Sequence, residues 1–245
     1  MIDLQESPRK NREQPLLQHL LEFRSRILKS LFAVLVVFVG LFYFANDIYL
    51  FISEPLRSLL PAGSSMIATE VASPFLAPFK LTMVLSFFIA IPFVLHQLWG
   101  FISPGLYLHE KRIAIPLLTV SVLLFYSGVS FAYFAVFPIL FAFFTSTGPE
   151  SVTIMTDINH YLDFILKLFF AFGVAFEIPV ATILLVWSKV TTTKSLSKKR
   201  PYVIVGCFII GMLLTPPDIL SQTLLAIPMW LLFELGILLS KLIKI

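Results

Sequence analysis

The sequence has few charged side chains and almost no cysteine. Of its 245 residues, 13% are charged and 58% are hydrophobic, and the mean hydropathy is +0.92. Soluble domains carry about 25% charged residues, so this chain has too few polar side chains to cover a water-facing surface. The single cysteine, Cys207, excludes an intrachain disulfide. This composition excludes an ordinary soluble enzyme, a disordered chain and a disulfide scaffold, and it indicates an integral membrane protein.

The sequence also lacks the motifs of common catalytic and nucleotide-binding sites. It contains no H-E-x-x-H, G-x-S-x-G, P-loop or G-x-G-x-x-G pattern. Its four histidines lie in different segments, and only the weak pair of His160 and Asp163 has a spacing that suits a metal. We therefore expect a protein that is not an enzyme and that needs neither a metal nor another cofactor.

Charged residues divide the sequence into apolar runs that can cross a membrane. A spanning helix needs about 20 apolar residues, and a shorter one of 14 rises only about 21 Å against a hydrocarbon core near 30 Å. The sequence predicts an all-α, polytopic membrane protein in which the fifth and sixth helices are short. The six predicted transmembrane helices lie at about 27–45, 79–102, 113–144, 161–187, 202–215 and 219–240.

The positions of the basic residues predict the orientation of these helices. All but three of the 18 Lys and Arg residues lie in the N-terminal segment, in alternate loops and in the tail; the exceptions are Arg57, Lys80 and Lys167. Basic loops stay in the cytoplasm, so both termini are expected there, with residues 1–26 as a cytoplasmic segment. The basic residues of the cytoplasmic segments account for the net charge of +4, and no nucleic-acid partner is needed to explain it. Without an internal repeat, residues 1–245 are expected to form one membrane domain.

Two carboxylates, Glu22 and Glu110, lie among these cations near the membrane boundary. A structural interpretation pairs Glu22 with Arg26 at i,i+4 and neutralises Glu110 with the adjacent Lys111 and Arg112. Spacing alone favours this interpretation. The alternative is a pair of carboxylates that binds arginine, whose guanidinium offers two parallel hydrogen bonds where lysine offers a point charge.

Glu177 lies well inside the fourth apolar run. A charge in the centre of a membrane helix costs about 2.5–3.5 kcal/mol on insertion scales, and such residues are functional by default. A neighbouring helix could satisfy the carboxyl, with His96 as the candidate partner, but we favour a polar point on a concave wall. Together with Glu234, Glu177 also supports an alternative function, a proton-coupled secondary transporter of a small solute.

A second acid of the fourth apolar run has a basic residue one helical turn away. Asp163 is expected to pair with Lys167 at i,i+4.

Motifs spread over most of the chain resemble those of a known family. They are HLLEFRSRI, YFANDIY, SMIATEVASPF, QLWGFISPGLYLHEKR, LLFYSGVSFAYFAVFP, FAFGVAFEIPVA, KKRPYVIVG and GMLLTPPDILSQTLLAIPMWLLFELG. From about Leu17 to Lys241 the sequence resembles TatC of the proteobacterial type, the multi-spanning subunit of the twin-arginine protein translocase. Phe23 stands where many members have leucine.

The resemblance implies a function and a site. It implies a concave, glove-shaped bundle that is the receptor and core scaffold of the translocase. Such a receptor binds the twin-arginine signal peptides of folded precursors at the cytoplasmic face, and the proton motive force drives export. It assigns peptide binding to Glu22, Arg24, Phe101 and Glu110, which reverses the preference for the structural interpretation, and it places Glu177 on the concave interior.

The resemblance also implies partners and a location. Single-span proteins of the TatA and TatB type are expected to contact the fifth and sixth helices at Met212, Thr215 and Gln222. The chain is further expected to contact membrane lipid and to form homo-oligomers within a larger complex. It is expected in the bacterial inner membrane.

Overall fold

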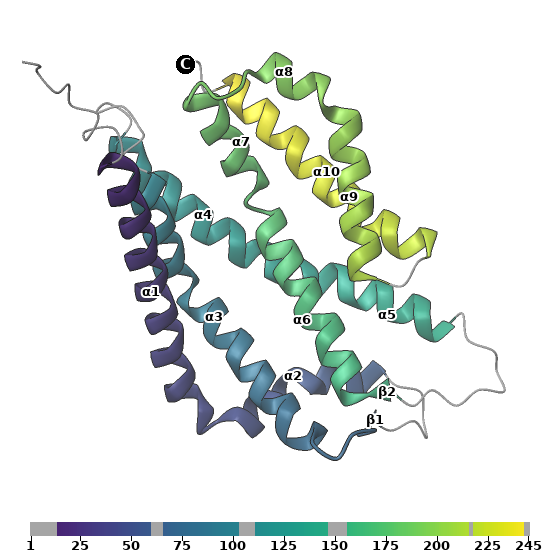
Figure 1. The fold of residues 1–245 in the computed structure, drawn as a ribbon. Coiled ribbons are helices and arrows are strands. Elements are labelled where there is room, and N and C mark those ends of the chain that lie inside the picture. The colour runs from purple at the N-terminus through teal and green to yellow at the C-terminus, as the bar shows by residue number, and fades with distance from the viewer. Residues whose placement is uncertain (1–13, 60–65, 103–110, 147–155, 216–217, 243–245) are drawn as a thin grey trace, which may run out of the picture.

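The computed structural model describes residues 14–59, 66–102, 111–146, 156–215 and 218–242, and it is almost entirely helical (Figure 1). Two short strands, β1 (Met66–Ile67) and β2 (Thr156–Asp157), pair in parallel. The helices are α1 (Gln14–Phe42), α2 (Ala45–Leu59), α3 (Ser73–Ile102), α4 (Lys111–Phe131), α5 (Phe137–Ser146), α6 (Ile158–Ala175), α7 (Ile178–Trp187), α8 (Thr193–Lys198), α9 (Arg200–Leu214) and α10 (Ile219–Leu242), with a π-helical turn, η3 (Ala132–Val136), between α4 and α5.

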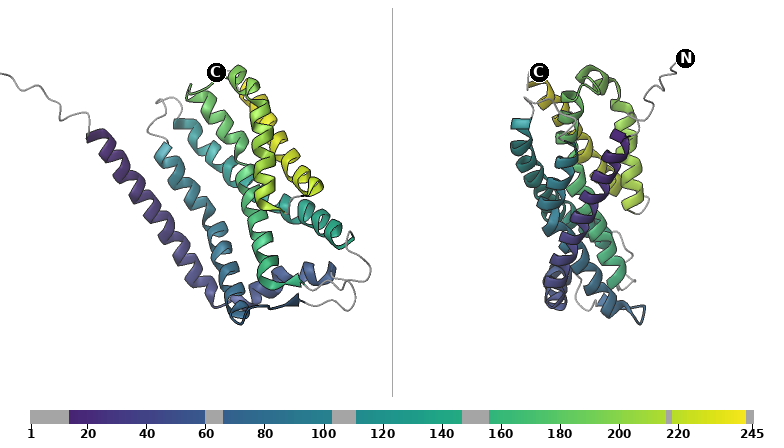
Figure 2. Two further views of the ribbon diagram at one scale, coloured as in Figure 1. Left: turned by 45° about the vertical axis from the view of Figure 1, so that its right-hand side comes forward. Right: turned by 60° about the vertical axis from the view of Figure 1, so that its left-hand side comes forward.

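Five helical stretches are long and apolar enough to cross a membrane, and α9 is a shorter apolar helix. The five stretches are Gln18–Phe42, Ser73–Phe101, Ile115–Phe144, Ile158–Trp187 and Ile219–Leu242. With α9 they agree with the six predicted crossings and the all-α, polytopic fold. The third crossing runs obliquely past the others as one long helix made of α4, η3 and α5 (Figures 1 and 2).

The fourth crossing is interrupted between α6 and α7, at Glu177. Pro179 has no backbone N–H, and its ring would clash with the carbonyl of Ala175 in a continuous helix. Accordingly α6 ends at Ala175 and α7 begins at Ile178, with Glu177 as its N-cap. The sequence thus places Glu177, the acid deepest in this crossing, at a local break in the backbone.

The two longest crossings pack closely where α4 meets α6. A methyl group added at Gly128 would lie 2.4 Å from the carbonyl oxygen of Phe172, and one at Gly173 would lie 2.6 Å from the ring of Phe125. Phe125 and Phe172 are both buried in the main apolar core. The absence of a side chain at these two glycines therefore lets the helices approach each other at the centre of the molecule.

The outer crossings lie at opposite edges of the molecule. At one edge α1 packs chiefly on α3, and many of its apolar side chains are exposed, as expected of a surface that faces lipid or a partner. At the other edge α9 and α10 form a hairpin, and α10 packs against α7. Because α9 has only 15 residues, it is about 22 Å long, and the hairpin turns well short of the far end of the molecule (Figure 2).

The far end, where α1 ends and α6 begins, is held by polar contacts around Asp157. Its carboxylate accepts hydrogen bonds from the Thr69 hydroxyl at 2.6 Å and the Thr69 amide at 3.0 Å. It also caps α6 by accepting from the amides of Asn159 and His160. These hydrogen bonds, led by that of the Thr69 side chain, lower the pKa of Asp157 to about 2.

A predicted ion pair at this end is wrong. Asp163 does not pair with Lys167 one turn along its own helix; it forms an ion pair with Lys80 of α3, while Lys167 is exposed. The pair links α3 to α6.

Asp157→Asn is expected to lower the melting temperature of the detergent-solubilised protein by a few degrees at pH 7. Because the folded-state pKa lies below the ordinary value of 3.8, the charged form stabilises the protein above about pH 4. This contribution disappears as the pH falls through about 2. Melting curves recorded by tryptophan fluorescence should therefore converge for the two proteins across that range. Asp163→Asn, which removes a single exposed ion pair, should have a smaller effect; equal effects at every pH would contradict this assignment.

Candidate functional site

Glu22 and Arg26 lie in the first half of α1. This helix packs beside α3 (Figure 1). Arg26 donates to Glu22 Oε1 from Nε at 2.9 Å and from Nη2 at 2.7 Å. The i,i+4 pair of the structural interpretation is therefore confirmed. Arg26 Nη1 also donates to the side chain of Gln97 on α3, at 3.5 Å, so the pair is tied to a second helix.

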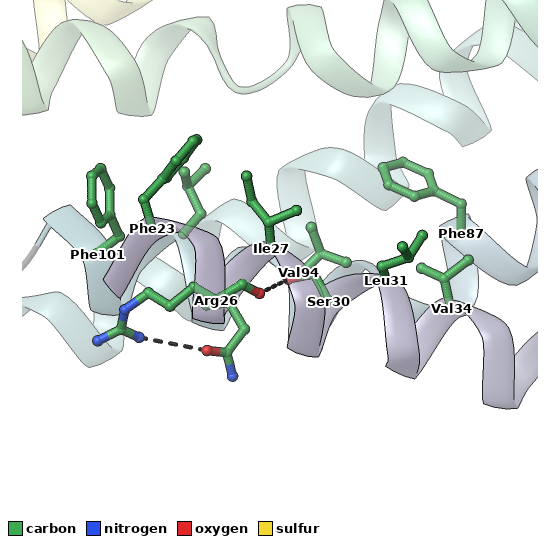
Figure 3. Close-up of a pocket in the computed structure, with 11 residues that line it drawn as sticks. Phe23, Arg26, Ile27, Ser30, Leu31, Val34, Phe87, Val94 and Phe101 are labelled. Carbon is green, nitrogen blue, oxygen red and sulfur yellow. Dashed lines mark hydrogen bonds between the residues drawn. The ribbon is translucent and has the colours of Figure 1, made fainter. Parts of the chain in front are cut away.

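An aromatic cluster lies next to this pair. Phe101 stacks on His19, with ring centroids 4.2 Å apart, and it contacts Phe23 at 5.1 Å. Figure 3 shows Phe23 and Phe101 on the same side of Arg26. The structure thus brings Glu22 and Phe101, two of the four predicted peptide-binding residues, into one region.

The other two predicted residues are placed differently. Arg24 is exposed on α1. Glu110 lies outside the residues that the structure describes, so its predicted role stays a prediction.

Two residues of this region, His19 and Gln97, are not indicated as site residues by the sequence patterns. For Gln97 the available signal was a polar side chain within an apolar run.

An apolar groove of about 330 Å³ starts at this cluster and runs between α1 and α3 (Figure 3). We call it the α1–α3 groove. It is lined by Phe23, Arg26, Ile27, Ser30, Leu31, Val34, Phe87, Val94, Gln97, Leu98 and Phe101. Figure 3 shows Arg26, Phe23 and Phe101 at one end and Leu31, Val34 and Phe87 at the other. The aromatic cluster and Arg26 at one end therefore continue into a space that suits apolar side chains.

Glu177 lies apart from this region. Its Oε1 is buried and accepts no hydrogen bond of ordinary geometry from any described residue. The hydroxyl of Ser121, on α4, is likewise buried without a hydrogen-bond partner among the described residues, whereas His96 is exposed on α3. The expected pairing of His96 with Glu177 is therefore not seen.

Glu234 is held in an ion pair. Arg200 Nε lies 2.6 Å from Glu234 Oε1, and Arg200 Nη2 donates to Oε2 at 2.7 Å. This two-point contact joins the beginning of α9 to the second half of α10. The carboxylate of Glu234 is thus engaged by a neighbouring helix.

The three predicted partner contacts lie near the turn between α9 and α10. Met212 is 51% exposed. Thr215 is buried, and its hydroxyl donates to the carbonyl of Gly211 at 3.0 Å. Gln222 is half-buried, and its backbone packs against Gly211. Only Met212 presents most of its side chain outward, and the role of all three stays a prediction.

Comparisons with known proteins agree with one another. The family model described as "Sec-independent protein translocase protein (TatC)" matches residues 18–228. A Sec-independent protein translocase protein TatC of Azotobacter chroococcum is 65% identical over 230 residues, which are 94% of this chain and 90% of the relative. The protein of the same name from Escherichia coli is 57% identical over 228 residues, or 93% and 88% of the two chains.

A solved structure gives the same result. The crystal structure described as that of the "Twin Arginine Translocase Receptor- TatC" is 39% identical in sequence. It matches 91% of this chain and 98% of its own with a TM-score of 0.82. The agreement therefore extends over nearly the whole of both chains.

The Arg200–Glu234 pair predicts an energetic coupling that a double-mutant cycle measures. Arg200→Gln and Glu234→Gln should each lower the melting temperature of the detergent-solubilised protein. The double variant should lose less stability than the sum of the two single losses. The difference, the coupling energy, should be about 0.5–1 kcal/mol for a pair that is partly exposed. Lys199→Gln, a neighbouring loss of the same charge, serves as the control. Purely additive effects would show that the two side chains do not interact.

Proposed function

Because this chain belongs to the TatC family of Sec-independent protein translocase proteins, we propose that it is the translocase receptor for twin-arginine signal peptides. As a member of that family it is a multi-pass membrane protein and a subunit of the translocase. The proposal places the receptor site at Glu22, Arg24, Phe101 and Glu110. The similar crystal structure carries the description of a twin-arginine translocase receptor, which supports the proposal.

The observation that carries this proposal is that Phe101 lies at one end of the α1–α3 groove and that Glu22 is bonded to Arg26, which lines the same end. A guanidinium can bind a carboxylate through parallel hydrogen bonds and also stack on an aromatic ring, whereas a lysine ammonium cannot do either in the same way. Signal peptides carry a positively charged region followed by an apolar one. The order of polar site and apolar groove along α1 matches this order in the peptide.

The proposed orientation places both termini and the receptor site in the cytoplasm, with the chain in the bacterial inner membrane. The excess of Lys and Arg at that end of the helices supports it. In the proposed complex, single-span TatA and TatB proteins contact α9 and α10 at Met212, Thr215 and Gln222. Further copies of this chain and membrane lipid complete the assembly, which takes its energy from the proton motive force. We assign the chain no catalytic turnover, cofactor or nucleic-acid partner, and we treat residues 1–245 as one domain.

The alternative function, a secondary transporter that uses Glu177 and Glu234, is not supported. The family is one of protein translocases, and Glu234 is engaged by Arg200. For Glu177 we retain the proposal of a polar point on the inner face of the bundle. Its position at the break between α6 and α7, with a buried oxygen that no described residue satisfies, supports that role.

Glu22→Gln and Glu110→Gln are each expected to weaken crosslinking of the receptor to the arginine pair of a precursor signal peptide. Hydrogen bonds to charged groups are worth about 1.5–3 kcal/mol, so each variant should lose about tenfold or more in affinity, and the double variant should lose more. A peptide with two lysines should bind the wild-type receptor more weakly than one with two arginines.

The matched control is Glu70→Gln, which removes a carboxylate at the opposite end of the molecule. Crosslinking should be unchanged in this variant. Full crosslinking and export by the double variant, or equal binding of lysine and arginine peptides, would overturn the site assignment.

A further inference from the structure

Arg26 engages only one of the two oxygens of Glu22. Its Nε and Nη2 both donate to Oε1, and no described donor reaches Oε2. A carboxylate has about four lone-pair sites, two on each oxygen, so Arg26 can occupy those of Oε1 and leave those of Oε2 open. The Glu22 side chain is 35% exposed, which leaves it accessible to a ligand.

The Arg26 side chain is itself confined by α3. It is 25% exposed, and its Nη1 contacts the side chain of Gln97, a residue that is only 9% exposed. A methyl group added at Gly100 would lie 2.2 Å from Nη1, so the guanidinium has no free space on that side. The guanidinium is thus held between Glu22 on its own helix and the backbone of α3.

We propose that Arg26 is a positioning residue that fixes the Glu22 carboxylate through Oε1 so that Oε2 receives an arginine of the signal peptide. The inference rests on the proposed function, because it concerns the same site. Holding a rotamer-rich side chain in place before binding removes part of the entropic cost of ordering it on association. Gln97 contributes by limiting the movement of the Arg26 guanidinium.

A simpler view of Arg26 leads to the opposite expectation. If Arg26 only repelled a cationic peptide, or only competed with it for Glu22, then removing it would tighten binding. The sign of the change in affinity therefore distinguishes positioning from competition.

Arg26→Lys is the sharpest test because it keeps the charge and loses the planar donors that hold Oε1 and Gln97. We expect this variant to bind a twin-arginine peptide about three- to tenfold more weakly than the wild type, measured by fluorescence titration of the detergent-solubilised receptor. Arg26→Gln should also bind more weakly. Lys29→Gln, one turn further along α1, is the control for loss of charge, and its affinity should stay equal or increase.

Each variant is then combined with Glu22→Gln. If Arg26 acts through Glu22, Arg26→Lys should change the affinity of the Glu22→Gln receptor by less than twofold, since the carboxylate it positions is gone. Unchanged or tighter binding by Arg26→Lys, or the same loss with and without Glu22, would overturn the inference. Failure of the proposed function would differ, because then Glu22→Gln alone would leave the wild-type affinity unchanged.

Discussion

The hydrocarbon core of a membrane offers no water to a backbone amide or carbonyl, and each unsatisfied group there costs several kcal/mol. The long apolar runs of this chain therefore form helices, in which the backbone satisfies itself. Several buried hydroxyl groups bond to their own helix: Thr82 donates to the carbonyl of Pro78, Ser86 to that of Thr82, and Ser240 to that of Gly236. The fourth crossing is interrupted before Pro179, and Glu177 is a polar group at this interruption.

Charged residues lie mainly towards the ends of the crossings, where they join helices in pairs. Lys80 and Asp163 join α3 to α6, and Arg200 and Glu234 join α9 to α10. The pair of Glu22 and Arg26 differs, because both of its members lie on one helix. Arg26 reaches a second helix only through the side chain of Gln97, so the Glu22 carboxylate itself fastens no other helix.

The crossings could be predicted from the sequence because apolar length is a local property. The contact between Glu22 and Arg26 could be predicted for the same reason, since four residues make one helical turn. The pairing of Asp163 could not, because its partner, Lys80, depends on how α3 and α6 are arranged in space. Likewise, the sequence does not show which face of α3 is buried: the polar residue His96 is exposed, and Gln97, one position later, is the buried side chain. The stacking of His19 on Phe101 also depends on the meeting of two helices.

The shortness of α9 also affects any helix that packs beside it. A partner long enough to cross the whole hydrocarbon core, about 30 Å, extends past the end of a 15-residue helix by several ångströms. Over that overhang it cannot touch α9 and must be covered by acyl chains or by another protein segment. The helix α9 can therefore contact a membrane-spanning neighbour along only part of that neighbour's length. The rest of the neighbour, beyond the end of α9, is available for contact with a third component.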